Sequence, residues 1–281
     1  ASLPSFYINR DCDDDRRTHI ESELRKVGIL AERVSAVEGL AVPEDFRDYF
    51  FEEERLCSAL KPGEVGCYAS HLKVLRMIVA RSLDYALVIE DDAILPPDLR
   101  NVVDDVLASA PQSWDFIHLC GEPRRAVKPI APLKHRGTLV RYSRIPGGTV
   151  GYLISREGAR KFLNPSKRVW PIDTDLRRPW LFRLNAFGVT PKIIDHDEDA
   201  PSPIKELGGR ARKRRGLPRP SQYAWTGNPL HCPESLFYYI RALGPHWWMA
   251  CWWRNVSMRA ARLLRMGTPA RQLLTTSPKN A

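Results

Sequence analysis

Three consecutive carboxylates, Glu90, Asp91 and Asp92, follow an apolar run at residues 85–89. Like charges crowded at the end of a buried segment are costly unless a cation neutralises them. Mg²⁺ and Mn²⁺ prefer oxygen ligands, and such an ion could bridge a diphosphate and stabilise the charge on a departing nucleoside diphosphate. The triplet therefore predicts a divalent metal site, and the alternative interpretation is a solvated acidic turn.

Further candidate residues lie before and after this triplet. Asp173 and Asp175 form a second acidic pair, and either could act as general base towards a reacting hydroxyl; the alternative is a helix N-cap after Pro171. His196 stands among acidic residues after an expected strand, so it could bind metal or be an ordinary loop histidine. His71 could contact a donor or acceptor molecule from a helix, or simply pack there.

Alternating strands and helices are expected to position these side chains. The expected strands lie at residues 5–9, 31–37, 85–89, 115–119, 138–142, 150–154 and 189–194. Apolar spacing predicts helices at residues 13–28, 62–81, 97–110 and 156–163. This alternation favours an α/β fold with a mostly parallel central sheet. Ligands of such sheets bind beyond the carboxyl ends of strands, which is where the triplet falls.

Charge divides the chain into two unequal parts. The 281 residues carry 43 Lys and Arg against 33 Asp and Glu, a net charge of +10. Residues 201–281 hold 14 basic and 2 acidic residues, or +12, so that residues 1–200 carry −2. We expect an α/β domain at residues 1–200, followed by a basic loop and an amphipathic helical region at residues 201–281. A basic region seeks an anionic partner such as a membrane surface, nucleic acid or phosphorylated substrate.

An amphipathic helix is expected near the end of the chain. On a helical wheel its apolar side carries aromatic and aliphatic residues: Trp252, Trp253, Val256, Ala260, Leu263 and Leu264. Arg254, Arg262 and Arg265 lie on the other side, a pattern typical of helices that lie on anionic lipid. The alternative is an ordinary helix that packs on the domain. No stretch reaches the roughly 20 apolar residues of a membrane span.

The cysteines and the start of the chain bear on its compartment. The six cysteines form no Cys-x-x-Cys pair and have no zinc-ligand spacing. The first residues lack the charged and apolar regions of a secretory signal. We therefore expect free thiols in a reducing compartment, and a cytoplasmic protein held peripherally on the inner face of the cytoplasmic membrane.

Taken in order, several segments are similar to glycosyltransferase family 25. This lipooligosaccharide-biosynthesis galactosyltransferase family also includes collagen galactosyltransferases. The matching segments are Tyr7-Ile8-Asn9, Arg16-Arg17, RVSAVEG at 33–39, LKPGEVGCYASH at 60–71, ALVIEDD at 86–92, YLISREGAR at 152–160 and Pro171-Ile172-Asp173. The resemblance covers roughly residues 4–200, and the ordered set is far more specific than any single member.

The resemblance implies a GT-A fold, a nucleotide-binding α/β domain with one mixed sheet. It implies transfer of a hexose, often galactose from UDP-galactose, with inversion at the anomeric carbon. The implied partners are a nucleotide sugar and a lipooligosaccharide or lipopolysaccharide acceptor, and the implied metal is Mn²⁺ or Mg²⁺. Two features depart from the family: Arg10 stands where Leu is usual, and residues 120–136 show no pattern that can be placed.

The resemblance also implies roles for particular residues. Asp92 would ligate Mn²⁺, while Glu90 or Asp91 would hold the ribose or the sugar. Asn9 and Arg16 match the segment that should line the nucleotide pocket, and Asp173 matches the family's downstream aspartate.

Two readings without catalysis compete with this one. A basic nucleic-acid-binding protein would explain the +12 region, but no nucleic-acid motif accompanies it. A degenerate scaffold at the membrane would not need to keep the costly acidic triplet.

Overall fold

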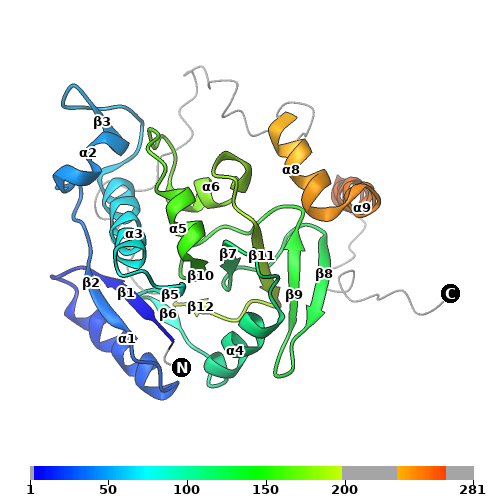
Figure 1. The fold of residues 1–281 in the computed structure, drawn as a ribbon, viewed down its shortest axis with the longest axis horizontal. Helices are drawn as coiled ribbons and strands as arrows, with labels where there is room; N and C mark the ends of the chain where they lie inside the picture. Colours follow the sequence, from blue (N-terminus) through cyan, green and yellow to red (C-terminus); the bar gives the residue numbers. More distant parts are fainter. Residues whose placement is uncertain (1–2, 198–232, 264–281) are drawn as a thin grey trace.

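The computed structural model describes residues 3–197 and 233–263. Its centre is one eight-stranded sheet (Figure 1). In spatial order the strands are β2 (Glu32–Ser35), β1 (Ser5–Asn9), β5 (Tyr85–Glu90), β10 (Gly151–Ser155), β7 (Phe116–His118), β11 (Ala186–Thr190), β9 (Thr138–Tyr142) and β8 (Val127–Pro132). The triplet therefore begins at the last residue of β5, near the middle of the sheet.

The sheet is mixed, so the expectation of a mostly parallel sheet is wrong. β1 pairs in parallel with β2 and β5, and β7 pairs in parallel with β11. The other four pairings, β5 with β10, β10 with β7, β11 with β9 and β9 with β8, are antiparallel. The cause is the connections: no helix separates β7, β8, β9 and β10, whereas a parallel crossover needs a connection of about a dozen residues or more, usually a helix.

Helices cover both faces of the sheet (Figure 1). They are α1 (Asp14–Lys26), α2 (Glu44–Phe50), α3 (Pro62–Ala80), α4 (Leu99–Ser109), α5 (Arg156–Phe162), α6 (Ile172–Leu176), the 3-10 helix η1 (Pro179–Leu181), α8 (Pro233–Leu243) and α9 (Pro245–Leu263). One core lies between the sheet and α3, α5 and α6, and the other between the sheet and α1 and α4. Ala86 and Val88 of β5 enter the first core, Leu87 and Ile89 the second, as expected of a central strand.

Local sequence explains how α3 begins. Pro62 occupies the first turn, where its missing N–H costs nothing. The carboxylate of Glu64 accepts a 2.9 Å hydrogen bond from the backbone N–H of Lys61, which satisfies a donor at the helix start. The same helix then carries Cys67 and His71, four residues apart and therefore on one side.

Two short pairs complete the strands. β3 (Phe51–Glu52) pairs with β4 (Arg55–Leu56), and β6 (Ala93–Ile94) pairs with β12 (Asp195–His196), both antiparallel. The second pair lies directly after the acidic triplet, so it brings residues 195–197 to the carboxyl end of β5.

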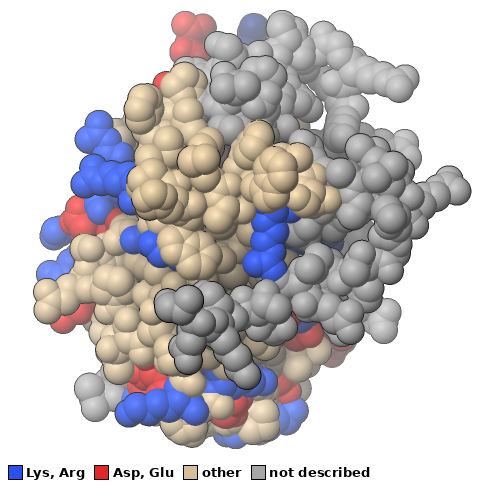
Figure 2. All heavy atoms as spheres, turned by 90° about the vertical axis from the view of Figure 1, so that its right-hand side faces the viewer, with Lys and Arg blue, Asp and Glu red and all other residues tan. Residues whose placement is uncertain are grey.

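The helices α8 and α9 pack against the rest of the fold, on the face shown in Figure 2. The hydroxyl of Tyr238 donates a 2.9 Å hydrogen bond to the carbonyl of Leu184, and the side chain of Asn255 accepts one of 3.0 Å from the N–H of Ala126. The expected boundary at residue 200 and most of the expected basic loop lie outside the described residues. Within the described ranges, no helix has the length and apolarity needed to cross a bilayer.

Candidate functional site

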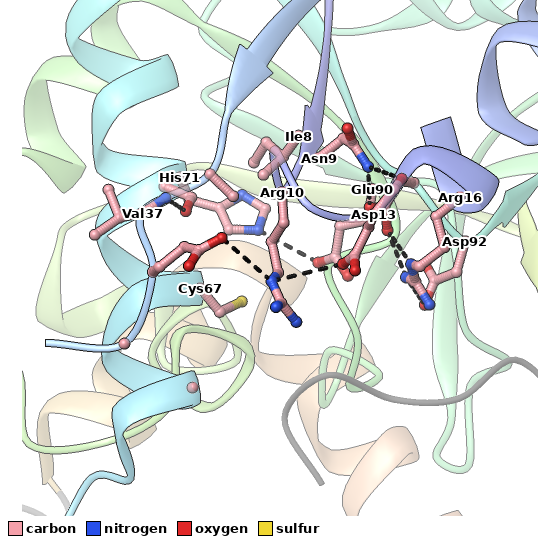
Figure 3. Close-up of a pocket in the computed structure, with 16 residues that line it drawn as sticks. Ile8, Asn9, Arg10, Asp13, Arg16, Val37, Cys67, His71, Glu90 and Asp92 are labelled. Atoms are coloured by element: carbon pink, nitrogen blue, oxygen red, sulfur yellow. Dashed lines mark hydrogen bonds and ion pairs between the residues drawn. The ribbon is translucent and has the colours of Figure 1, made fainter. Parts of the chain in front are cut away.

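The acidic triplet lies beside the end of β1, because β1 and β5 are parallel neighbours whose carboxyl ends meet. The side chain of Asn9 donates a 2.9 Å hydrogen bond to one carboxylate oxygen of Asp91, and Nε of Arg16 donates one of 2.8 Å to the other (Figure 3). The structure thus brings together Asn9, Arg16 and Asp91, three of the residues expected at the donor pocket. Both oxygens of Asp91 are engaged.

A pocket of about 130 Å³ opens over these residues. Its walls are the ends of β1 and β5, the loop at residues 36–39 and the first turns of α3 (Figure 3). Nε of Arg10 lies 3.6 Å from a carboxylate oxygen of Asp13 and 3.8 Å from one of Glu38, at the edge of the pocket. The pocket is therefore lined by both basic and acidic side chains. A site for an anionic ligand and a bound cation needs both kinds of group.

Glu90 is held by two neighbours from distant parts of the chain. Nε2 of His71 lies 3.3 Å from one of its carboxylate oxygens, and the hydroxyl of Thr149 donates a hydrogen bond to the same oxygen. Burial acts to raise the pKa of Glu90, but the contacts with His71 and Thr149 outweigh it, so the pKa lies below its ordinary value. The other ring nitrogen of His71 lies 2.9 Å from the hydroxyl of Tyr152, which fixes the orientation of the ring.

Asp92 is the least compensated of the three carboxylates. One oxygen lies 3.2 Å from the guanidinium of Arg16, while the other is buried and has no hydrogen-bond partner within the described part of the chain. Burial, followed by the nearby charge of Glu90, raises the pKa of Asp92 above its ordinary value. A buried oxygen with unbalanced negative charge fits a divalent cation, which prefers such ligands.

Three further ligand atoms could hold a metal ion. The thiol of Cys67, the ring of His71 and the carboxylate of Glu90 have ligand atoms within 4.8 Å of one another. Burial, together with the charges of Glu90, Asp173 and Asp92, raises the pKa of the Cys67 thiol well above its ordinary value. Because metals bind the thiolate, a cation here would first have to displace that proton.

The backbone of His196 lies near the triplet. Its strand pairs residue for residue with β6, and the N–H of Asp197 donates a 3.1 Å hydrogen bond to the carbonyl of Asp92. The imidazole is exposed, with Nδ1 3.7 Å from a carboxylate oxygen of Asp195. His196 is not among the three grouped metal-ligand side chains found in the described residues.

The acidic pair on α6 divides into two different environments. Asp175 is buried, accepts a 2.9 Å hydrogen bond from the hydroxyl of Tyr68 and pairs at 2.5 Å with Arg178. Asp173 is half-buried, and one of its oxygens lies 3.5 Å from the position that a Cβ at residue 147 would occupy. Asp173 is not among the residues that line the pocket, but its side chain is only half-buried, whereas Asp175 is engaged in the core.

Sequence reasoning missed two contributors. Thr149 reaches Glu90 from the loop before β10, and Arg33 donates a 3.0 Å hydrogen bond to the side-chain oxygen of Asn9. The pair Gly147-Gly148 was a signal for a tight approach of that loop, because Gly148 adopts φ +101°. Nothing local to either residue predicts its partner.

Comparisons with known proteins identify relatives of the chain. The model of "Glycosyltransferase family 25 (LPS biosynthesis protein)" matches residues 3–176. A mouse protein named "Inactive glycosyltransferase 25 family member 3" is 28% identical over 86% of this chain and 45% of its own length. Human procollagen galactosyltransferase 2 is 29% identical over 60% of this chain and 29% of its own. The chain thus spans less than half the length of these curated relatives.

One solved structure also aligns with the chain. It is a glycosyltransferase involved in the glycosylation of the major capsid of PBCV-1, and it covers 57% of this chain and 63% of its own, with a TM-score of 0.30 and 8% identity. This likeness is too low for a comparison of folds.

Proposed function

The chain belongs to glycosyltransferase family 25, and on that premise we propose that it transfers a hexose from a nucleotide-sugar donor to a glycan acceptor. The names of the relatives favour galactose, and thus UDP-galactose as donor. The description of the family as one of lipopolysaccharide biosynthesis favours a lipooligosaccharide-type acceptor. The GT-A fold is part of the same proposal and agrees with the mixed sheet.

The observation that carries the proposal is the buried oxygen of Asp92 at the edge of the pocket, which has no hydrogen-bond partner among the described residues. Asp92 would hold Mn²⁺ or Mg²⁺, and the exposed ring of His196 is the candidate for a second ligand. When bound, the ion would neutralise charge on the diphosphate leaving group. Asn9 and Arg16 would then act as positioning residues, because they fix Asp91 and with it the end of β5.

Asp173 is the proposed general base. Its carboxylate would accept the proton of the acceptor hydroxyl as that oxygen bonds to the anomeric carbon. The bond from the same carbon to the diphosphate breaks, its electron pair leaves with the diphosphate, and the configuration inverts. Asp175 is less suited to this role, because both its oxygens already have partners in the core.

The relative named inactive supports a second candidate, a protein that binds a nucleotide sugar without transferring it. Binding and turnover must therefore be measured separately. The first experiment measures calorimetric binding of UDP with Mn²⁺, and the second measures Mn²⁺-dependent hydrolysis of a panel of nucleotide sugars.

Wild type is compared with Asp92→Asn, and with Asp48→Asn as a matched control, because Asp48 is an exposed residue of α2. The enzyme proposal predicts metal-dependent turnover of one donor that Asp92→Asn abolishes and Asp48→Asn preserves. Metal-dependent binding without turnover, also in the presence of candidate glycan acceptors, would favour the non-catalytic candidate. Absence of both would refute the proposed site.

A further inference from the structure

The helix α9 turns a stripe of large apolar side chains towards solvent. Met249, Trp252, Trp253 and Val256 have exposed fractions of 63%, 47%, 68% and 41%. Their spacing of three, four and seven residues places them on one side of the helix. Leaving four such side chains in water is unfavourable, so the stripe indicates a partner.

The opposite side of α9 makes the contacts with the protein. Cys251 is buried there against Ala126 and Leu243. Asn255 accepts a hydrogen bond from the N–H of Ala126 and donates one of 3.2 Å to the hydroxyl of Ser143. The helix thus packs on the domain through Cys251, Asn255 and the partly buried Trp248. This side of α9 agrees with the alternative considered from the sequence, a helix that packs on the domain, whereas the apolar stripe is exposed.

Two more large apolar side chains of α8 and α9 are exposed. Phe237 of α8 is 70% exposed, and Trp247 at the start of α9 is also exposed. The neighbouring Tyr238 and Tyr239 contact the rest of the fold instead. The hydroxyl of Tyr238 donates a hydrogen bond to the carbonyl of Leu184, and the ring centroid of Tyr239 lies 5.8 Å from that of Trp180. Figure 2 shows this face, on which uncharged residues form a broad area with Lys and Arg side chains beside it. We call Phe237, Trp247 and the stripe of α9 the α8–α9 apolar surface.

The sequence of α8 and α9 is positively charged. Residues 233–263 contain four arginines and one acidic residue, Glu234, and the side chains of Arg241 and Arg254 are the two arginines that the structure describes there. Exposed Arg241 lies on α8 itself. A second copy of the chain would bring the same positive charge against it, which opposes self-association through this surface. A negatively charged partner is favoured instead.

We propose that the α8–α9 apolar surface docks on an anionic lipid bilayer, with α9 lying in the plane of the membrane. Tryptophan prefers the level of the lipid headgroups, where its ring is partly buried and its N–H is still solvated. Arginine beside the apolar stripe can pair with headgroup phosphates. The proposal requires no activity of the pocket and goes beyond the proposed function.

The test is sedimentation of the full chain with vesicles. Phosphatidylcholine vesicles are compared with vesicles that also contain phosphatidylglycerol, at low and at high salt. The double variant Trp252→Gln, Trp253→Gln removes the centre of the stripe. Leu30→Gln is the matched control, because Leu30 is 93% exposed and lies before β2. All three proteins should have the same thermal midpoint, since the altered side chains are exposed.

We expect wild type and Leu30→Gln to bind the anionic vesicles, and to bind less at high salt. The double variant should partition at least about tenfold more weakly, because two aromatic side chains no longer enter the interface. Absence of vesicle binding, or equal binding by the double variant, would overturn the proposal. So would concentration-dependent self-association, without lipid, that the double variant abolishes. The vesicle assay contains no donor, so its failure would leave the proposed function untouched.

Discussion

The side chain of Asn9 joins the ends of two parallel strands through its 2.9 Å hydrogen bond to Asp91. The same amide nitrogen donates to the carbonyl of Asp13 at 3.1 Å, and the amide oxygen accepts from Nε of Arg33. Donor and acceptor are both used, so only an amide satisfies this position. Asn9 therefore fixes the geometry of the acidic triplet.

Asn9→Asp should destabilise the protein, because it replaces a donor with a second carboxylate next to Asp91. We expect a loss of roughly 2 kcal/mol or more in the free energy of unfolding at neutral pH. The loss relative to wild type should shrink in acid, where the carboxylates are protonated. Urea unfolding at two pH values measures both effects. A variant as stable as wild type at neutral pH would contradict the assigned role of Asn9.

Asp173 and Asp175 should respond differently to substitution. Asp173→Asn should lower kcat by about 10²-fold or more if it is the base, with little change in the free energy of unfolding. Asp175→Ala should cost about 3 kcal/mol or more, because it removes the buried carboxylate that both Arg178 and Tyr68 contact in the core. Rates must be normalised to folded protein. The reverse pattern would show that the two roles are exchanged.

The titration of Asp175 should appear in the stability of the protein. Burial raises its pKa to about 6 from an ordinary value of 3.8, although Arg178 opposes the shift. Between these values the folded state binds more protons than the unfolded state, so stability should fall as pH rises from about 4 to about 6. The decrease amounts to at most about 3 kcal/mol.

The control for this titration is Asp175→Asn, which cannot ionise. The difference in unfolding free energy between wild type and this variant should change across that pH window and be flat above it. A flat difference throughout would mean that Asp175 is ionised normally in the folded protein.

Sequence alone could predict what depends on local pattern. The apolar run of β5 identifies a central strand, and the ordered segments link Asn9, Arg16 and the triplet to one pocket. The sequence does not distinguish the roles of Asp173 and Asp175. Side chains two residues apart on a helix differ by about 200° around its axis, so these two carboxylates point to nearly opposite sides. Only the packing of the helix shows which of the two sides is buried.

Non-local pairings could not be predicted in the same way. Thr149 contacts Glu90 because β10 lies antiparallel between β5 and β7. That strand order depends on how all strands of the sheet pair, not on the local sequence. The strand β8 was missed because it contains Pro129 and Pro132, residues that disfavour a strand. The two prolines are tolerated because β8 is an edge strand of the sheet, where a missing backbone N–H need not interrupt the hydrogen bonds between strands.

A divalent cation should stabilise the protein through Asp92. Mn²⁺ is expected to raise the thermal midpoint of wild type and of Asp48→Asn, because a ligand that binds only the folded state shifts the equilibrium towards it. Asp92→Asn should show a much smaller rise, and a chelator should reverse the effect. An equal rise in Asp92→Asn would place the cation elsewhere, and Cys67 would then be the next residue to replace.

Gly66 allows α3 to approach the loop that lines the pocket. A Cβ at this position would lie 2.4 Å from the carbonyl oxygen of Val37, and Ser70 holds the same loop by accepting a 2.8 Å hydrogen bond from the N–H of Val37. Gly66→Ala should therefore displace the loop, cost about 1–3 kcal/mol of stability and weaken UDP binding.

Gly158→Ala provides the matched comparison for Gly66→Ala. Its Cβ would lie 2.3 Å from the carbonyl oxygen of Asp115, a clash of the same kind beneath β7 and outside the lining of the pocket. Both variants should lose stability in urea unfolding, but only Gly66→Ala should lose calorimetric affinity for UDP in the folded fraction. If Gly158→Ala weakened binding equally, the loss would reflect general destabilisation, and the loop at residues 37–39 would have no particular part in holding the nucleotide.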